Sequence, residues 1–189
     1  DVIVRGVNTH PGEAKNKMKN SILIGIEFNF MLPPHEIPFC TDGYEGFHHL
    51  QSIDGDEEKT VLHYIIRDHD MAKFEAKKKT FEKAAAYLNY LYGGGTIELK
   101  IQDSYYNMKE NIKPYLFLVE DAKKAMEKAG VTPKIVPIRG GTDGSRLSFM
   151  GLPCPNLSTG GINFHSRFEY ISIQSMDHMT DVLVNLMTV

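Results

Sequence analysis

The first hundred residues alternate short apolar strands with longer stretches of helical periodicity. Residues 2–7 (VIVRGV) read as a strand, and the helix expected next opens at His10-Pro11-Gly12 and ends before Pro33-Pro34. Its apolar residues recur at every fourth position and would form one buried stripe: Ala14, Met18, Ile22, Ile26 and Phe30.

Two further strands and a second helix follow. The strands are expected over residues 47–53 and 59–67, and the acidic turn DGDEEK joins them. A charged helix is expected over residues 71–92, and the glycines at 93–95 end it. One face of this helix is apolar.

A last strand completes the first part of the chain. Ile97, Leu99 and Ile101 alternate with polar residues, as they do in a half-buried strand. The resulting order β-α-β-β-α-β is that of a ferredoxin-like α+β domain, which we place over residues 1–110.

Residues 111–189 alternate helices with short apolar segments, which indicates an α/β arrangement. The expected elements are a helix from about Asn111, a strand at 135–138, a short helix capped by Thr142 or Asp143, a strand at 155–158, and a final helix with Met176, Met179, Leu183 and Leu186 on one face. So few strands cannot bury both faces of a sheet. We therefore expect exposed apolar surface in this part of the chain.

Composition narrows the class of protein. The net charge of −3 and the pI of about 6.3 argue against nucleic acid as a partner, because phosphate binding needs a basic face. No apolar run is long enough for a membrane span, so no membrane association is expected. Cys40 and Cys154 form no Cys-x-x-Cys pair, which is typical of a cytoplasmic protein. The chain begins with Asp1 and without a signal peptide, as a fragment would.

The segment from Pro137 to His165 concentrates reactive side chains in turns, where chemistry is usually held. Arg139 precedes a glycine pair at a helix entrance, so its guanidinium and the free backbone N–H groups could both face an anion. His165 follows a second glycine pair. Both clusters are expected at the ends of neighbouring strands, where open α/β sheets bind ligands.

Five segments of the chain carry a family resemblance: NTHPGEAK, TDGYEGFHHL, LHYIIRDHD, IQDSYYNMKE and RGGTDGSRLSFMGLPCPNLSTGG with the following Asn163 and His165. In order and spacing they resemble the peptidase T group of aminotripeptidases, in the di-zinc exopeptidase family that also holds carboxypeptidase G and succinyl-diaminopimelate desuccinylase. The resemblance implies a ferredoxin-like lid or dimerisation domain, followed by the C-terminal part of a zinc-exopeptidase α/β catalytic domain. It also implies a cytoplasmic enzyme that cleaves tripeptides with a free N-terminus.

The resemblance implies two zinc ions per intact active site, of whose ligands only the last, His165, is matched here. Glu57-Glu58 imitates the family's catalytic pair, but it lies in a polar hairpin turn that explains its charge. A catalytic zinc needs about three protein ligands and a base for its water. We therefore expect this chain alone to be inactive.

Four other residues are candidate site residues. By resemblance, His10 polarises the scissile carbonyl, often from the neighbouring subunit of a homodimer formed through the lid, and Asn107 helps to bind substrate or the oxyanion. Arg67 and Arg139 could meet the terminal carboxylate of a peptide with bidentate geometry.

Two other classes of protein remain open. One is a non-catalytic ferredoxin-like module that pairs with itself or another protein; the missing zinc ligands favour it, and the joint presence of His10, Arg139 and His165 argues against it. The other is a related di-zinc amidohydrolase or carboxypeptidase, which would share the architecture and should differ around YEGF and IIRD.

Overall fold

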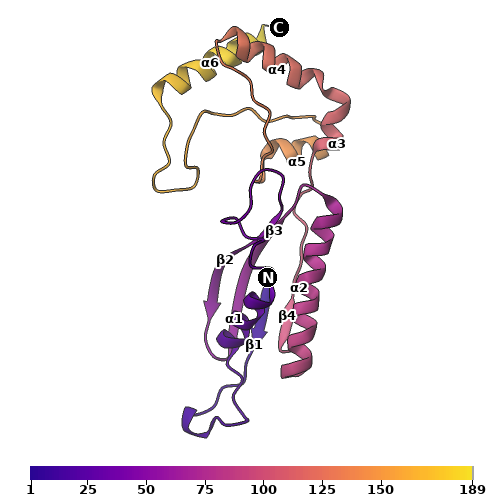
Figure 1. The fold of residues 1–189 in the computed structure, drawn as a ribbon, viewed down its shortest axis with the longest axis vertical. Coiled ribbons are helices and arrows are strands. Elements are labelled where there is room, and N and C mark those ends of the chain that lie inside the picture. The colour runs from indigo at the N-terminus through magenta and orange to yellow at the C-terminus, as the bar shows by residue number, and fades with distance from the viewer. Residues whose placement is uncertain (189) are drawn as a thin grey trace. The chain divides into compact units, whose positions relative to one another are not determined.

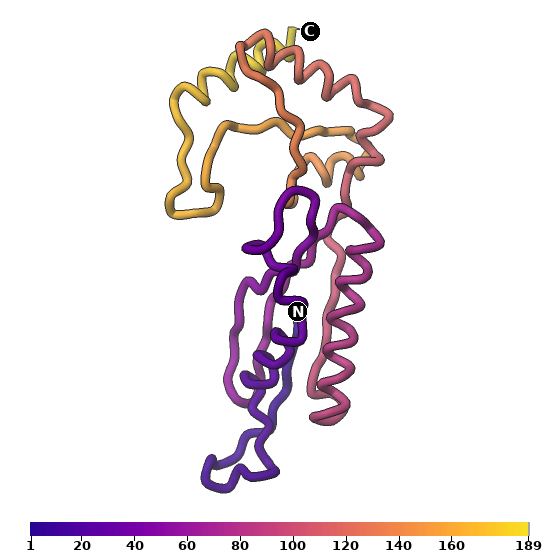
Figure 2. Tube along the Cα trace, viewed as in Figure 1, coloured from indigo at the N-terminus to yellow at the C-terminus, as the bar shows by residue number. Residues whose placement is uncertain are grey.

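The computed structural model of the chain describes residues 1–188 and contains two compact units, Asp1–Asp103 and a second one that begins at Ser104. Residues 104–110, placed with the lid from the sequence, pack with the second unit. Each unit is described by itself (Figures 1 and 2).

The first unit is a four-stranded antiparallel sheet with two helices packed on it (Figure 1). Its elements are β1 (Val2–Arg5), the 3₁₀ turn η1 (Pro11–Glu13), α1 (Ser21–Met31), β2 (Phe47–Gly55), β3 (Lys59–Arg67), α2 (Met71–Tyr92) and β4 (Ile97–Leu99). The strands lie in the order β2-β3-β1-β4, so β1 and β3, the two strands that precede helices, are neighbours in the sheet although β2 lies between them in the chain. This confirms the predicted β-α-β-β-α-β order and the ferredoxin-like plan.

The core of this unit lies between the helices and the sheet. Both helices contact strands and each other, and the residues they bury include Phe28 and Leu88, each with no exposed area. The complete core cluster is Val2, Val4, Ile24, Phe28, Leu32, Leu62, Phe81, Ala84, Ala85, Leu88 and Ile97. A large side chain of this kind contributes roughly 1.5–3 kcal/mol by its burial.

The first helix differs from the prediction in its start and in its buried face. After β1 the chain forms η1 and an isolated bridge between Val7 and Lys19, and α1 begins only at Ser21. The expected helix start at His10 is therefore wrong. Asn20 explains the later start, because its side chain caps the helix by accepting the Leu23 N–H at 3.1 Å.

The predicted apolar stripe of α1 does not face the core. Ile26 and Phe30 are 40% and 79% exposed, whereas Ile24, Gly25 and Phe28 are buried. The helix is apolar on nearly every side, so its period could not show which face is inside. Gly25 determines which face of the helix packs on the sheet. A Cβ there would lie 2.9 Å from the Leu62 Cδ1 atom of β3, so the helix approaches β3 most closely at this glycine.

The remaining elements of the first unit follow the prediction closely. Helix α2 spans the predicted residues, with Asp70 as its N-cap and Gly93, at a φ of 103°, after its last turn. The strands β2 and β3 flank the acidic turn as expected. Strand β4 ends at Leu99, so Ile101 lies outside it and is 39% exposed.

The second unit consists of helices and irregular segments. Its elements are α3 (Lys109–Ile112), the 3₁₀ turn η2 (Lys113–Tyr115), α4 (Phe117–Lys128), α5 (Asp143–Phe149) and α6 (Ile173–Met187). The strands predicted at 135–138 and 155–158 do not form between residues 104 and 188. A strand needs a neighbour for its backbone hydrogen bonds, and in this range the one pairing is an isolated bridge between Ile162 and Tyr170.

The helix pair α4 and α6 carries the small core of the second unit. Val182 is fully buried in α6, whereas Met176 and Leu183, predicted to face inward, are 44% and 48% exposed. The predicted face is therefore wrong for those two residues. The expected exposed apolar surface is confirmed, as shown by Ile135 at 70% and Met150 at 75% exposed.

Across residues 1–188, none of the helices combines the length and the apolar character that crossing a bilayer requires.

A buried histidine lies within the core of the first unit. His48 of β2 is 4% exposed, and its ring contacts those of Tyr64 and Phe81 at centroid distances of 6.5 and 5.8 Å. Burial lowers the pKa of His48 below its ordinary value of 6.5; the carboxylate of Glu36 opposes this shift, and the ammonium of Lys77 adds to it.

The first unit is therefore expected to lose stability in mild acid. Because the pKa of His48 is depressed in the folded state, the neutral ring stabilises the fold fully above pH 6.5, and this contribution is lost as the pH falls through the folded-state pKa. Urea midpoints measured from about pH 8 to about pH 5 should fall in the wild type and change less in His48→Leu. His49→Leu, at the exposed neighbouring position, should keep the wild-type slope. Equal slopes in all three proteins would contradict the assignment to His48.

Candidate functional site

His10 lies in the loop after β1, where it caps the turn η1. Its Nδ1 accepts a hydrogen bond from the Gly12 N–H at 3.1 Å, and its carbonyl oxygen accepts the Glu13 N–H at 2.8 Å. Pro11 occupies the first position of the turn, where its missing N–H has no consequence. The side chain of His10 is exposed.

The His10 loop and the β2–β3 turn together line a shallow concavity. Its lining residues are Asn8, Thr9, His10, Pro11, Ala14, Met18, Asn20, Glu57 and Glu58. Within it, the Asn8 Nδ2 donates to Glu57 Oε1 at 3.2 Å. The concavity therefore combines one imidazole with two carboxylates and two amides.

Gly6 allows this concavity to form, because the loop and the turn meet at its backbone. The Gly6 N–H donates to the Glu58 carbonyl at 2.7 Å, and the Ser21 N–H donates to the Glu57 carbonyl at 3.0 Å. A Cβ at Gly6 would lie 2.1 Å from the Glu57 oxygen and 2.3 Å from the Lys19 oxygen. No side chain fits there.

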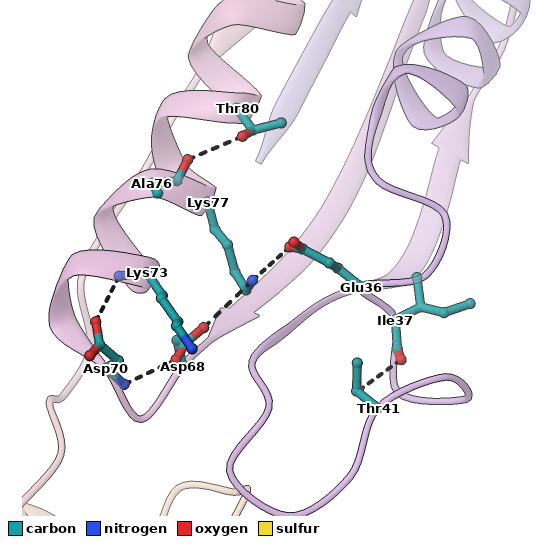
Figure 3. A network of polar contacts seen from close by, with 9 residues as sticks. All are labelled: Glu36, Ile37, Thr41, Asp68, Asp70, Lys73, Ala76, Lys77 and Thr80. Atoms are coloured by element: carbon teal, nitrogen blue, oxygen red, sulfur yellow. Dashed lines mark hydrogen bonds and ion pairs between the residues drawn. The ribbon is translucent and has the colours of Figure 1, made fainter.

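Arg67 ends β3, next to a partly buried ionic network at the start of α2 (Figure 3). The carboxylate of Asp68 is 1% exposed; its Oδ1 accepts the Asp70 N–H at 3.0 Å, and its Oδ2 lies 3.5 Å from the Lys77 ammonium. Lys77 also pairs with Glu36 at 2.6 Å, so one ammonium lies between two carboxylates.

The two segments YEGF and IIRD, which carried part of the family resemblance, meet at this end of the sheet. Phe47 and Arg67 are opposite each other in the β2–β3 ladder. A Cβ at Gly46 would lie 1.9 Å from Asp68 Oδ2, and the rings of Tyr44 and His69 stack edge to face at 5.2 Å. The same Cβ would lie 2.6 Å from the Arg67 carbonyl oxygen, so the backbone of Arg67 is part of a tightly packed junction.

His10 and Arg67 lie at opposite ends of the first unit. His10 shares its concavity with Glu57 and Glu58, just before β3 begins, whereas Arg67 is the last residue of that strand (Figure 1). Eight residue steps along a strand span about 26 Å. An extended tripeptide spans about 10 Å, so it cannot reach both side chains of one protomer.

The second unit contains the other three candidate residues. Asn107 is exposed just before α3, and its Oδ1 accepts the Lys109 N–H at 3.0 Å, as in an ordinary turn. Arg139 is half-buried in an irregular segment that precedes α5. The predicted cap of α5 is confirmed at Thr142, whose hydroxyl accepts the Ser145 N–H at 3.1 Å. The expected placement of Arg139 at a strand end is wrong, because that strand is absent here.

His165 lies at the tip of a loop closed by the Ile162–Tyr170 bridge. Its φ is 64° and that of Asn163 is 58°, which places two non-glycine residues in the left-handed region. The His165 N–H donates to Glu169 Oε2 at 2.8 Å, and the imidazole is exposed. The turn thus presents this side chain to solvent.

Residues 1–188 do not form a zinc site by themselves. Among residues 1–188, no group of three or more His, Cys, Asp or Glu side chains is arranged to hold a metal ion. A catalytic zinc needs about three protein ligands, and His165 could supply one.

Sequence reasoning missed two residues that shape these sites. Asp68 appeared there only within the segment LHYIIRDHD, because nothing in RDHD marks one carboxylate as buried while Asp70 caps a helix. Sequence reasoning also treated Gly12 only as part of a helix start. The histidine two residues earlier was the available signal, since a side chain at that spacing can accept the glycine N–H.

The chain is similar to curated proteins named peptidase T. The chain is 57% identical over 185 residues to a peptidase T from Halothermothrix orenii and 52% identical over 185 residues to that of Bacillus subtilis. Each match covers 98% of this chain and 45% of the relative, so the chain spans slightly less than half the length of these proteins.

Solved structures support the fold. A tripeptidase from Staphylococcus aureus superposes with a TM-score of 0.75 at 18% identity, and an aminopeptidase from Bacillus cereus with a TM-score of 0.68 at 21% identity. Each match covers 98% of this chain and 49% of the other. Residues 1–95 match the family model described as a peptidase dimerisation domain. The chain therefore belongs to the family that carries the peptidase dimerisation domain, and the predicted resemblance to peptidase T is confirmed over nearly its whole length.

Proposed function

We propose that this chain supplies the lid and the C-terminal catalytic segment of an aminotripeptidase, which removes the N-terminal residue of tripeptides. The observation that carries the proposal is the 57% identity to a peptidase T across 98% of the chain. The proposed location is the cytoplasm, consistent with two cysteines that are both free.

In this proposal the candidate residues divide the work of binding. His10 donates a hydrogen bond to the carbonyl oxygen of the scissile peptide, and Asn107 assists with its uncharged amide. Arg67 and Arg139 are the candidates for holding the terminal carboxylate, since a planar guanidinium matches it with two hydrogen bonds. A carboxylate clamp at a fixed distance would select peptides by length.

We propose zinc as the cofactor, with His165 as one ligand. The remaining ligands then have to come from outside residues 1–188, because the metal cluster is incomplete within them. The chain alone should consequently lack hydrolytic activity. A stoichiometric zinc bound tightly by this chain, or its unaided cleavage of Ala-Ala-Ala, would contradict this.

The proposed assembly is a homodimer formed through the first unit. Support comes from the match of residues 1–95 to a dimerisation domain and from the separation of His10 and Arg67 by about the length of β3. If both residues act on tripeptides, His10 serves the active site of the partner subunit. A non-catalytic pairing module would give no reason for two subunits to share His10 and Arg67 in this way.

The proposal is tested with Arg139→Ala in the full-length peptidase that contains this chain. The Michaelis constant should rise about ten- to hundred-fold for free-acid tripeptides, the effect of losing a charge-assisted hydrogen bond, and change little for C-terminally amidated ones. Arg146→Ala, on the exposed face of α5, is the matched control and should leave both substrates unaffected.

Two results would count against this function. Equal effects of Arg139→Ala on free-acid and amidated peptides would contradict the proposed role of Arg139 in binding the terminal carboxylate. Failure of the wild-type full-length protein to cleave any tripeptide would contradict the proposed peptidase activity.

A further inference from the structure

We infer that the backbone N–H of Gly12 holds the neutral His10 ring in the tautomer that carries its proton on Nε2. Gly12 is then a positioning residue, which acts on substrate only through His10. The catalytic meaning of this inference rests on the proposed peptidase function, whereas the tautomer itself does not.

The hydrogen-bond direction fixes the tautomer. A neutral imidazole has one N–H donor and one acceptor nitrogen. The backbone N–H of Gly12 can only donate, and it lies 3.1 Å from His10 Nδ1, so that nitrogen is the acceptor. The proton of the neutral ring is therefore on Nε2.

The surrounding turn restrains the ring. The His10 carbonyl accepts the Glu13 N–H at 2.8 Å, so both the side chain and the main chain of His10 close the same turn. The ring also packs directly on Gly12, because a Cβ there would lie 3.2 Å from both Nδ1 and Cε1 of the imidazole. A histidine anchored in this way keeps one nitrogen inward and presents the other outward.

The tautomer decides what His10 can do in the concavity. With the proton on Nε2, the outward nitrogen is an uncharged donor, as required to stabilise a developing carbonyl oxyanion. With the proton on Nδ1, the same nitrogen would present a lone pair and repel that oxygen. The carboxylates of Glu57 and Glu58 line the same concavity and accept hydrogen bonds only.

The primary test is a ¹⁵N spectrum of the imidazole rings in the full-length protein, recorded at about pH 8, where histidine is neutral. The His10 signals, assigned by their loss in His10→Gln, should show an unprotonated Nδ1 and a protonated Nε2. An Nδ1-protonated ring, or equal populations of the two tautomers, would overturn the inference.

The second test removes the donor. Gly12→Pro lacks the N–H and should reduce the excess of the Nε2–H tautomer by about tenfold, the bias that one hydrogen bond supplies. The control Gly12→Ala keeps the N–H; the ring has to move by a few tenths of an ångström to admit its Cβ, and the tautomer should stay that of the wild type. In the peptidase assay, kcat should fall in Gly12→Pro with the Michaelis constant nearly unchanged.

The outcomes separate this inference from the proposed function. An unchanged tautomer in Gly12→Pro would overturn the role of Gly12. A changed tautomer with unchanged kcat would overturn its catalytic consequence and leave the peptidase activity standing. Absence of tripeptide cleavage by the wild type concerns the proposed function alone, since the spectrum does not depend on it.

Discussion

Mixing two defective variants of the full-length peptidase, His10→Ala and Arg67→Ala, is expected to restore activity to about one quarter of the wild-type value. Half of the randomly paired dimers contain one protomer of each variant, and each of these mixed dimers has one intact site out of two. Alone, His10→Ala should lower kcat/KM about a hundred- to thousand-fold, as the loss of an oxyanion donor does. Arg67→Ala should lower kcat/KM for free-acid tripeptides about ten- to hundred-fold.

The reason for this recovery is the length of β3. His10 and Arg67 lie at its two ends, so in the proposed homodimer one tripeptide can reach both only if they come from different protomers. Mixing His10→Ala with His10→Gln is the control and should restore nothing, since neither protomer brings an intact imidazole. Strictly additive activities in the first mixture, after subunit exchange has been verified, would mean that the two residues do not belong to different protomers of one shared site.

Gly6→Ala is expected to destabilise the dimerisation domain by at least about 3 kcal/mol, at the upper end of the cost of overpacking. The new Cβ would lie 2.1 and 2.3 Å from two carbonyl oxygens of the backbone, which cannot rotate away as a flexible side chain could. Amides paired between β1 and β3 should therefore exchange with solvent roughly a hundred-fold faster, as measured by hydrogen exchange.

Gly94→Ala is the matched control for that substitution. No atom lies within 4 Å of a Cβ at Gly94, so the exchange rates of the same amides should stay at their wild-type values. If Gly6→Ala exchanged as slowly as the wild type, the close approach of the His10 loop to the β2–β3 turn would be disproved.

The elements predicted best from the sequence are those in which the apolar pattern agrees with the residues that begin and end the element. Helix α2 has a polar face, an Asp70 cap and a terminal glycine, and its bounds were found correctly. Helix α1 is apolar almost all round, so its period could not identify the inner face, and tertiary contact at Gly25 decided it. The apolar segment 135–138 has the composition of a strand, but composition cannot provide the neighbouring strand that its backbone would need.

The candidate site was predictable in its residue types and less so in its geometry. Motif similarity drew attention to His10, Arg67 and His165, whose roles stay predictions. That His10 and Arg67 lie at opposite ends of one sheet could not be read from their spacing in the chain, because it depends on the antiparallel pairing of β1 with β3. The burial of Asp68 likewise arises from long-range packing around Gly46.

Because His165 lies in a left-handed turn, the conformation of the main chain sets the direction in which its imidazole points. A non-glycine residue in this conformation costs about 1–2 kcal/mol, and the turn meets that cost with the Ile162–Tyr170 bridge and the Glu169 contact to its own backbone. An exchange of Glu169 could therefore change the direction of this histidine, without altering the histidine itself or any residue beside it in the chain.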